Sequence, residues 1–584
     1  MPSSLPQAPA RSALEIAAAA GPAVLASFFL CGLALFLNPE LPLSAGVLAR
    51  GTGWVAAALV PLSVAFHALL ARFSGVAPRR IVPWTLFCVL ATFAATAWYD
   101  AAHYGFFLPP GIDSQLVKTA LWLSLGALLV FYTALLHSVH RRRYGRRSQA
   151  LFLAVAIGTM FALFDRRANY RPPPPGPPRL PGIENVASPQ LLVVGIDTAT
   201  LDVILPLADQ GKLPFFSRLL NEGAAARLVS LAPARELPLW ATLATGKLPY
   251  RHGLIGDELY FVPWIGGERP LRLLPWSSVL GPLARRAFGS RAATADDSEA
   301  LPVWEILARL ERRVGAVGFA AALSPSRGLP LEISQEFFTG DGGRVAPAEL
   351  RARGQRFRVE PAGLDAARRR AFADAQQPEL AAALAGDRWR SSLVSFLLGG
   401  EDRPEALFLR LPGLASASRA TFGGFQAATF EGARAGAAQR AAAALAAYYV
   451  DLDQQLASLW ATLPAPRLLA VVSEVGVEPP SLAGRLLAAL GRRSALSGDW
   501  REAPDGLLLL AGNGIRAGTR LVEADLSDLV PTLLYALGLP IARDFDGRVL
   551  TGAFDPAFLQ QNPLTFVASY EGLPTAVEEP VEQK

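Results

Sequence analysis

The sequence is short of cysteine and histidine for its length. Its 584 residues include only two cysteines and five histidines. Cys31 and Cys88 both lie within long apolar segments, so they indicate neither a disulfide nor a redox compartment. Beyond residue 165 the only histidine is His252. A metal centre that needs several histidine ligands therefore cannot be assembled from the C-terminal part of this chain alone.

Acidic and basic residues are absent from five long segments near the N-terminus. Each segment is about as long as the roughly 17–25 residues that a helix needs to cross a membrane. Apolar residues make up 52% of the chain, which is high for a soluble enzyme. A buried helical core or a cleaved signal peptide would be the alternatives, but five such segments in succession favour membrane spans. The segments are Ile16–Pro39, Gly51–Ala71, Ile81–Tyr99, Thr119–His140 and Ser148–Phe164.

The arginines between these segments predict an orientation. Three arginines follow the second segment and five follow the fourth, whereas the other two loops have only Arg50 and Lys118 near their ends. By the positive-inside bias, the N-terminus and the even loops face the cytoplasm. We therefore expect a multi-pass protein of the cell (inner) membrane with an extracytoplasmic C-terminal domain. Three arginines soon after the fifth segment oppose this orientation: Arg166, Arg167 and Arg171.

Charge and proline content suggest the partners and the boundaries of the domains. The net charge of +6 arises largely from the juxtamembrane arginines, which suit anionic lipid headgroups better than nucleic acid. No basic stripe with interleaved aromatic residues predicts a nucleic-acid site. The proline-rich stretch Arg171–Pro181 predicts an extended spacer or, alternatively, a ligand for a proline-recognition module. We thus expect a membrane region (1–165), a linker (166–188), a large domain (189–560) and a tail (561–584).

From Pro189 onward, short apolar runs typical of strands alternate with helical segments. This alternation predicts an α/β fold with a mostly parallel sheet flanked by helices. In such sheets the chemistry lies beyond the carboxyl ends of the strands, where Asp197 and Glu474 are expected. The predicted strands are Leu191–Asp197, Val314–Ala322, Ala406–Leu411, Leu468–Val472 and Gly506–Ala511, and the predicted helices include Leu201–Glu222, Val303–Arg313, Ala437–Trp460 and Ser527–Leu537.

Three longer stretches of this domain, taken in their order along the chain, resemble a known family. They read VVGIDTATLDVILPLADQGKLPFFSRLLNEGAAARL, then LWATLATGKLPYRHGLIG, then DLVPTLLYALGLPIARDFDGRVL. From about Pro189 to Phe554 the chain resembles the type I phosphodiesterase/nucleotide pyrophosphatase branch of the alkaline phosphatase superfamily. The resemblance implies an alkaline phosphatase-like fold and, for active members, two zinc ions and a Thr or Ser nucleophile that attacks phosphorus. The arrangement of membrane spans ahead of such a domain also resembles that of lipid phosphoethanolamine and lipoteichoic-acid transferases, which do not share these motifs.

At the positions that match the family's catalytic residues, this chain has few of the residues that the family uses. Asp197 matches the first metal-binding Asp of the family. The nucleophile position falls on Glu236, and a carboxylate is a poor substitute for a metal-activated hydroxyl. The Asp-His-Gly motif reads Glu474–Val475–Gly476, in which glutamate can bind a metal and valine cannot.

Two further ligand positions of the family are also replaced. The mid-domain Asp and His fall near Ala415 and Arg419, and Gly498–Ala503 stands where a late histidine is expected. Arginines therefore accumulate around the expected cleft. If these registers hold, Arg235, Arg419 and Arg501 line it and suit an anionic lipid phosphate or a glycan.

Two hypotheses of different classes follow from this ligand census. In the first, the domain is catalytically degenerate, holds no cofactor and acts in binding or assembly at the membrane surface, with an anionic ligand or a protein partner. In the second, it is a metal-dependent phosphodiesterase, phosphatase or headgroup transferase with a remodelled site. Asp197, Glu236 and Glu474 would then converge on Ca²⁺, Mg²⁺ or Zn²⁺. A third option is that a partner chain completes the site.

Structural roles for the same carboxylates stand beside these hypotheses. Asp197 comes after a strand and before a helix, so it could simply cap that helix. Glu236 and Glu474 could be solvated surface residues.

Overall fold

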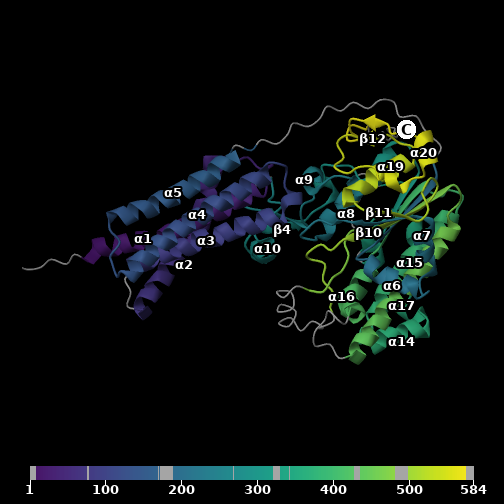
Figure 1. Cartoon of the computed structure of the whole chain (residues 1–584), viewed down its shortest axis with the longest axis horizontal. Coiled ribbons are helices and arrows are strands. Elements are labelled where there is room, and N and C mark those ends of the chain that lie inside the picture. The colour runs from purple at the N-terminus through teal and green to yellow at the C-terminus, as the bar shows by residue number, and fades with distance from the viewer. Residues whose placement is uncertain are drawn as a thin grey trace, which may run out of the picture. The chain divides into compact units, whose positions relative to one another are not determined.

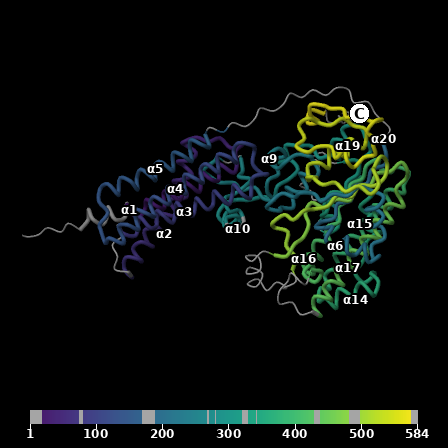
Figure 2. Tube along the Cα trace, in the orientation of Figure 1, coloured from purple at the N-terminus to yellow at the C-terminus, as the bar shows by residue number. Residues whose placement is uncertain are grey.

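The computed structural model of the chain forms two compact units (Figures 1 and 2). One unit contains Met1–Pro174 together with Ile255–Ala292, and the other contains Pro175–Leu254 together with Ala293–Lys584. The residues that the structure describes are 8–74, 78–168, 170, 188–266, 269–319, 329–340, 342–426, 435–480 and 497–573. The expected spacer Arg171–Pro181 lies outside them.

Within the described residues, the first unit contains five helices that are long and apolar enough to cross a membrane, and they lie at the five predicted segments. They are rich in alanine and leucine, which are good helix formers, although three of them contain an internal proline. The fifth helix extends several residues beyond the predicted segment at both ends. The helices are α1 (Ala8–Phe36), α2 (Ala45–Ser74), α3 (Pro78–His103), α4 (Ile112–Val139) and α5 (Arg146–Ala168).

Arg167, in the last turn of α5, has a role inside this unit. Its side chain is buried and donates hydrogen bonds to the carbonyl oxygens of Leu35 (2.7 Å), Leu41 (2.8 Å) and Pro39 (3.0 Å). Carbonyls at the end of a helix lack intrahelical partners, and a cation there also complements the helix dipole. Arg167 thus binds the last turn of α1 through Leu35 and the segment that follows this helix through Pro39 and Leu41.

The segment Ile255–Ala292 belongs to this first unit although it is far from the spans in sequence. It contains the antiparallel strands β3 (Glu258–Phe261) and β4 (Gly289–Ala292) and the helix α10 (Ser277–Ala287). Nothing in the sequence indicates this grouping.

The second unit is built around a nine-stranded sheet with the order β11-β2-β10-β9-β1-β8-β5-β6-β7. Within the described residues, neighbouring strands pair in parallel except that β10 is antiparallel to β9 and β2, and β7 to β6. The expected mostly parallel α/β sheet is therefore confirmed. The strands are β1 (Gln190–Ile196), β2 (Ala224–Leu228), β5 (Val314–Val317), β6 (Leu331–Ile333), β7 (Val345–Ala346), β8 (Ala406–Leu411), β9 (Arg467–Ser473), β10 (Gly506–Gly512) and β11 (Thr519–Leu521).

Helices cover both faces of this sheet (Figure 1). The predicted helix Leu201–Glu222 is two helices, because Gly211 takes a positive φ of 70° in the intervening turn. The helices named below are α6 (Leu201–Asp209), α7 (Pro214–Glu222), α8 (Glu236–Thr245), α9 (Pro249–His252), α11 (Val303–Arg309), α13 (Leu350–Gln355), α14 (Ala366–Asp374), α15 (Leu380–Gly399), α16 (Gly413–Phe425), α17 (Ala435–Thr462) and α19 (Leu529–Ala536).

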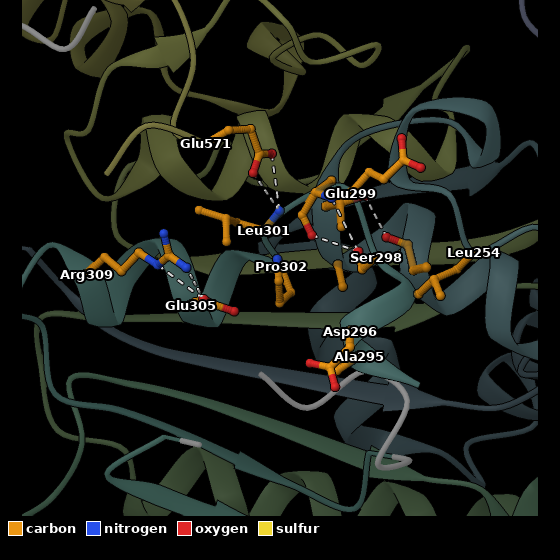
Figure 3. Close-up of a pocket in the computed structure, with 14 residues that line it drawn as sticks. Leu254, Ala295, Asp296, Ser298, Glu299, Leu301, Pro302, Glu305, Arg309 and Glu571 are labelled. Atoms are coloured by element: carbon orange, nitrogen blue, oxygen red, sulfur yellow. Dashed lines mark hydrogen bonds and ion pairs between the residues drawn. The ribbon is translucent and has the colours of Figure 1, made fainter. Parts of the chain in front are cut away.

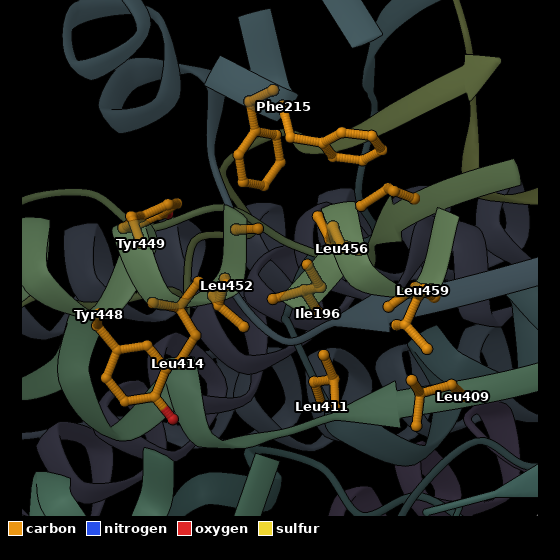
Figure 4. Close-up of a cluster of buried hydrophobic side chains, with 14 of the residues drawn as sticks. Ile196, Phe215, Leu409, Leu411, Leu414, Tyr448, Tyr449, Leu452, Leu456 and Leu459 are labelled. Atoms are coloured by element: carbon orange, nitrogen blue, oxygen red, sulfur yellow. The ribbon is translucent and has the colours of Figure 1, made fainter. Parts of the chain in front are cut away.

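The main core of the second unit fixes the ends of β1 and β8. Figure 4 shows Leu452, Leu456 and Leu459 of α17, spaced three and four residues apart, packed with Ile196 and Leu411 at the ends of these strands. All five side chains are fully buried, and each such burial stabilises the fold by roughly 1.5–3 kcal/mol. This packing fixes the positions of the residues that follow these strand ends.

Candidate functional site

Three parallel strands end together at one edge of the sheet. β1 pairs in parallel with both β8 and β9, so their carboxyl ends meet. Asp197 directly follows β1, Glu474 directly follows β9, and Arg410 is the next-to-last residue of β8. All three side chains are buried. The sheet therefore gathers two of the predicted carboxylates around an arginine.

The Arg410 guanidinium bridges Asp197 and Glu236. Its Nε donates to Asp197 Oδ1 (2.9 Å) and its Nη2 to Asp197 Oδ2 (2.6 Å) and to Glu236 Oε1 (2.7 Å). The guanidinium carbon also lies 4.8 Å from the centre of the Trp240 ring. Burial alone would lower the pKa of Arg410, but the charge and hydrogen bonds of Asp197 raise it above its ordinary value. Arg410 is thus a permanent cation between two carboxylates.

Glu236 is positioned by the start of α8. It is the first residue of that helix, where exposed N–H groups favour a negative charge, and its side chain is 59% exposed. The helix can lie close to the sheet because Gly195 of β1 has no side chain. A Cβ atom at residue 195 would come within 2.3 Å of the Trp240 ring. Gly195 and Trp240 therefore set the distance between Glu236 and the strand ends.

Asp197 does not cap the helix that follows it. The N-cap of α6 is Thr200, whose hydroxyl accepts a hydrogen bond from Asp202 N (3.2 Å). The carboxylate of Asp197 is instead committed to Arg410. Burial raises the pKa of Asp197, and the charge of Arg410 opposes this shift.

Glu474 is a buried carboxyl without a complete set of partners. Its Oε2 atom is buried and has no hydrogen-bond partner. Burial, and next the negative charge of Asp197, raise the pKa of Glu474 well above its ordinary value, which favours the protonated form. The alternative that Glu474 is a solvated surface residue is therefore wrong.

A second group of buried polar residues lies beneath this edge. Tyr448 of α17 donates a hydrogen bond to Asp387 of α15 (2.9 Å), and burial raises the pKa of Asp387 to about 7. Arg390 of α15 has a buried Nε without a partner, and burial lowers its pKa. Sequence reasoning missed Arg390 and Arg410. The available signal for Arg410 was a single arginine inside the otherwise apolar strand ALFLRL.

The three predicted binding arginines come from neighbouring segments. The Arg419 guanidinium on α16 lies 4.5 Å from the centre of the Trp500 ring. The next residue, Arg501, accepts a backbone hydrogen bond from Ala234 (3.2 Å), which directly precedes Arg235. The structure therefore brings the backbone segments of the expected basic surface together.

A separate pocket of about 310 Å³ lies along the C-terminal half of α8 (Figure 3). Its charged groups are largely paired. Arg309 binds Glu305, and Glu571 accepts two hydrogen bonds from Leu301 N (3.1 Å each) and one from Lys247 (2.7 Å). None of the predicted site residues is among those that line this pocket.

The side chains present do not fit the two zinc ions that the family resemblance implies. Arg410 already occupies oxygens of Asp197 and Glu236. Both ring nitrogens of the buried His252 are also used, by Leu254 N (3.1 Å) and by the Thr242 hydroxyl (3.2 Å). In the part of the chain that the structure describes, no group of three or more His, Cys, Asp or Glu residues could hold a metal ion.

Comparison with known proteins identifies one family. The family model described as type I phosphodiesterase / nucleotide pyrophosphatase matches residues 191–488, a little over half of the chain. No curated protein matches the chain.

Several solved structures are similar at low sequence identity. Human ectonucleotide pyrophosphatase / phosphodiesterase 5 is 12% identical, with a TM-score of 0.38, and the match covers 64% of this chain and 99% of that one. The murine protein, inactive and in complex with AMP, is 13% identical, with a TM-score of 0.38 and coverages of 60% and 96%. BT1596, a 2-O GAG sulfatase, is 12% identical, with a TM-score of 0.37 and coverages of 63% and 74%.

Replacing Arg410 tests the bridging role of its charge. Arg410→Gln leaves Asp197 buried without its cation, so we expect the free energy of unfolding to fall by about 3–5 kcal/mol at about pH 8. Without Arg410, the largest opposition to the rise that burial causes in the pKa of Asp197 is lost, and the folded variant binds a proton that the unfolded chain does not. The loss should therefore shrink as the pH falls to about 5. Denaturant unfolding of the purified chain at both pH values measures this.

The matched control for this experiment is Arg227→Gln. Arg227 pairs with Asp202 on the surface (2.6 Å, with side chains 46% and 41% exposed), so its loss should cost at most about 1 kcal/mol. An Arg410→Gln variant as stable as this control, or destabilised equally at both pH values, would contradict the bridging role.

Proposed function

The chain belongs to the type I phosphodiesterase/nucleotide pyrophosphatase family. We propose that its family domain is catalytically degenerate and that the membrane helices hold this domain at a membrane, where it acts in binding or assembly. The supporting observation is the Arg410 guanidinium bound to both Asp197 and Glu236. Active members need cations that polarise a phosphoryl group and activate a nucleophile. A guanidinium fixed to the chain cannot exchange a ligand for a phosphoryl oxygen or activate a nucleophile, and its Nε and Nη2 already bind Asp197 and Glu236.

The remaining carboxyls support the same proposal. Glu236, at the nucleophile position, is held by Arg410, and an ion-paired carboxylate is a weak nucleophile toward phosphorus. Burial and the charge of Asp197 raise the pKa of Glu474, which disfavours the ionised form that would bind a cation. The electrostatic stabilisation that provides most of the rate enhancement in such enzymes is therefore absent from these residues.

What the domain binds follows from the charge around the strand ends. Arg235, Arg419 and Arg501 lie on adjoining segments, and the start of α8 adds N–H groups. Arginine suits phosphate because its planar fork donates two parallel hydrogen bonds. We propose that this surface binds an anionic lipid phosphate or a glycan without cleaving it. A protein partner without such a group is the alternative outcome.

The domain's location follows from the loop arginines. Eight arginines lie in or beside the turns that follow α2 and α4, and by the positive-inside bias we propose that these turns face the cytoplasm. The chain after α5 would then be extracytoplasmic, in an inner membrane protein. Arg167 argues less strongly against this orientation than an exposed arginine would, because it is buried and bound to the carbonyl oxygens of Leu35 in α1 and Leu41 after it.

A second candidate function is a metal-dependent phosphodiesterase, phosphatase or headgroup transferase with a carboxylate site. It is favoured by the unpartnered Oε2 of Glu474 and by the 59% exposure of the Glu236 side chain, together with the metal dependence of the family. A Ca²⁺, Mg²⁺ or Zn²⁺ ion would have to displace Arg410 from both carboxylates.

Metal content measured together with turnover separates the two functions. We expect the purified full chain to hold well under one zinc ion and to leave bis(p-nitrophenyl) phosphate intact. Glu236→Thr, which restores a hydroxyl at the nucleophile position, should not restore turnover while Arg410 remains. About two zinc ions per chain with chelator-sensitive turnover would overturn the first function in favour of the second.

Anion binding is testable by calorimetry with glycerol phosphate as the probe. Binding should weaken about tenfold or more in the triple variant Arg235→Gln, Arg419→Gln, Arg501→Gln, because charge-assisted hydrogen bonds are lost. The control is Arg369→Gln with Arg370→Gln, which removes exposed arginines from α14. The absence of measurable heat with the unsubstituted chain would refute a phosphate-binding surface.

Orientation is testable by labelling single cysteines in intact cells. In a chain whose native cysteines are replaced by alanine, Val522→Cys should react with a membrane-impermeant maleimide, since Val522 is 96% exposed. Arg143→Cys, in the loop after α4, should react only after lysis. The reverse pattern would place the domain in the cytoplasm.

A further inference from the structure

The segment Ile255–Ala292 is fixed to the ends of the membrane helices by buried hydrogen bonds. Asn38, just after α1, is fully buried. Its side-chain carbonyl accepts hydrogen bonds from Arg272 N (2.6 Å) and Leu273 N (3.0 Å), and its amide donates to Leu273 O (2.7 Å). Asn38 therefore pairs with this segment as a neighbouring strand would.

Trp276 is held in an unusual backbone conformation at the start of α10. Its φ of 46° lies in the left-handed region, which a bulky residue rarely adopts. Two contacts with α3 and the residue after it hold it there. Asp100 Oδ1 accepts from Trp276 N (3.3 Å), and the Tyr104 and Ser277 hydroxyls are 2.7 Å apart. Such strain persists only where the surroundings impose it, and it is often functional.

The contacts of this segment all involve one end of the bundle. α1 and α3 end there, and α2 and α4 begin there. Trp54 of α2 lies 5.0 Å from the Phe288 ring, and a Cβ atom on Gly51 would come within 2.8 Å of Trp264. In a chain whose five helices cross a membrane, this end lies where the hydrocarbon core meets the headgroups.

The exposed residues of α10, together with Trp276, which directly precedes it, include apolar and basic side chains. Leu283 is 57% exposed and Trp276 is 38% exposed. Arg285 and Arg286 are also exposed, and Arg285 has one partner, Glu258, at 3.1 Å. A helix with this composition is typical of those that lie in the membrane interface, where tryptophan is enriched and arginine meets lipid phosphates.

We propose that α10 is an interfacial helix that binds anionic lipid headgroups beside the spans. Leu283 and Trp276 enter the boundary between headgroups and acyl chains, and Arg285 and Arg286 contact lipid phosphates. The polar contacts of Asn38, Asp100 and Tyr104 set the depth of the helix. This lipid surface belongs to the first unit and is independent of the strand-end site and of its proposed degeneracy.

The depth of α10 is measured with the full chain reconstituted in phosphatidylcholine vesicles containing phosphatidylglycerol. A bimane label on Leu283→Cys, in a chain without its native cysteines, should be quenched by lipids that carry a nitroxide near the headgroup. It should be quenched only weakly by aqueous iodide. Val522→Cys is the water-exposed reference. Iodide quenching at residue 283 as strong as at residue 522, without quenching by nitroxide lipid, overturns the proposal.

The arginine contacts are measured by lipid-dependent thermal stability in nanodiscs. Phosphatidylglycerol should raise the unfolding temperature of the chain relative to pure phosphatidylcholine, and Arg285→Gln with Arg286→Gln should remove about half of that rise or more. The matched pair Arg369→Gln with Arg370→Gln on α14 should leave it unchanged. An equal rise in all three proteins would show that these arginines do not bind anionic lipid.

Discussion

The buried guanidinium of Arg410 is the charge on which the strand-end site depends. A buried cation is tolerated only when its partners are close and well aligned, and here Asp197 and Glu236 supply them at 2.6–2.9 Å. The contacts require β1 and β8 in register and α8 close to the sheet. Gly195 permits that approach by leaving room for the Trp240 ring, which also lies against the guanidinium.

Arg410 occupies the edge of the sheet where active members of the family are expected to hold metal ions. Like a metal ion, it offsets the charge of the buried Asp197 and of the exposed Glu236, and so helps to stabilise the sheet edge. Unlike a metal ion, it cannot exchange a ligand for a phosphoryl oxygen or lower the pKa of a bound nucleophile. Arg410 does not bind every carboxyl oxygen at this edge of the sheet, because the buried Oε2 of Glu474 has no hydrogen-bond partner. Under the proposed function, the fold and the membrane helices persist and the domain binds its ligand without turnover.

The sequence was sufficient for the spans and for most of the central strands. Uncharged runs of spanning length and short apolar runs both reflect local composition, and Ala406–Leu411 matches β8 at both ends. Contacts between distant residues could not be predicted in this way. Arg410 donates a hydrogen bond to Glu236, 174 residues away in the sequence, and Asn38 donates one to Leu273, 235 residues away. For the same reason Asp197 and Glu474 were placed at strand ends, but the cation between Asp197 and Glu236 was not foreseen.

The most direct test is diffraction from crystals of the full chain soaked in zinc, with data collected at the zinc absorption edge. The account predicts Arg410 bound to both Asp197 and Glu236, with no anomalous peak between the carboxylates. A strong peak bound by Asp197 and Glu474, with the Arg410 side chain displaced, would contradict it.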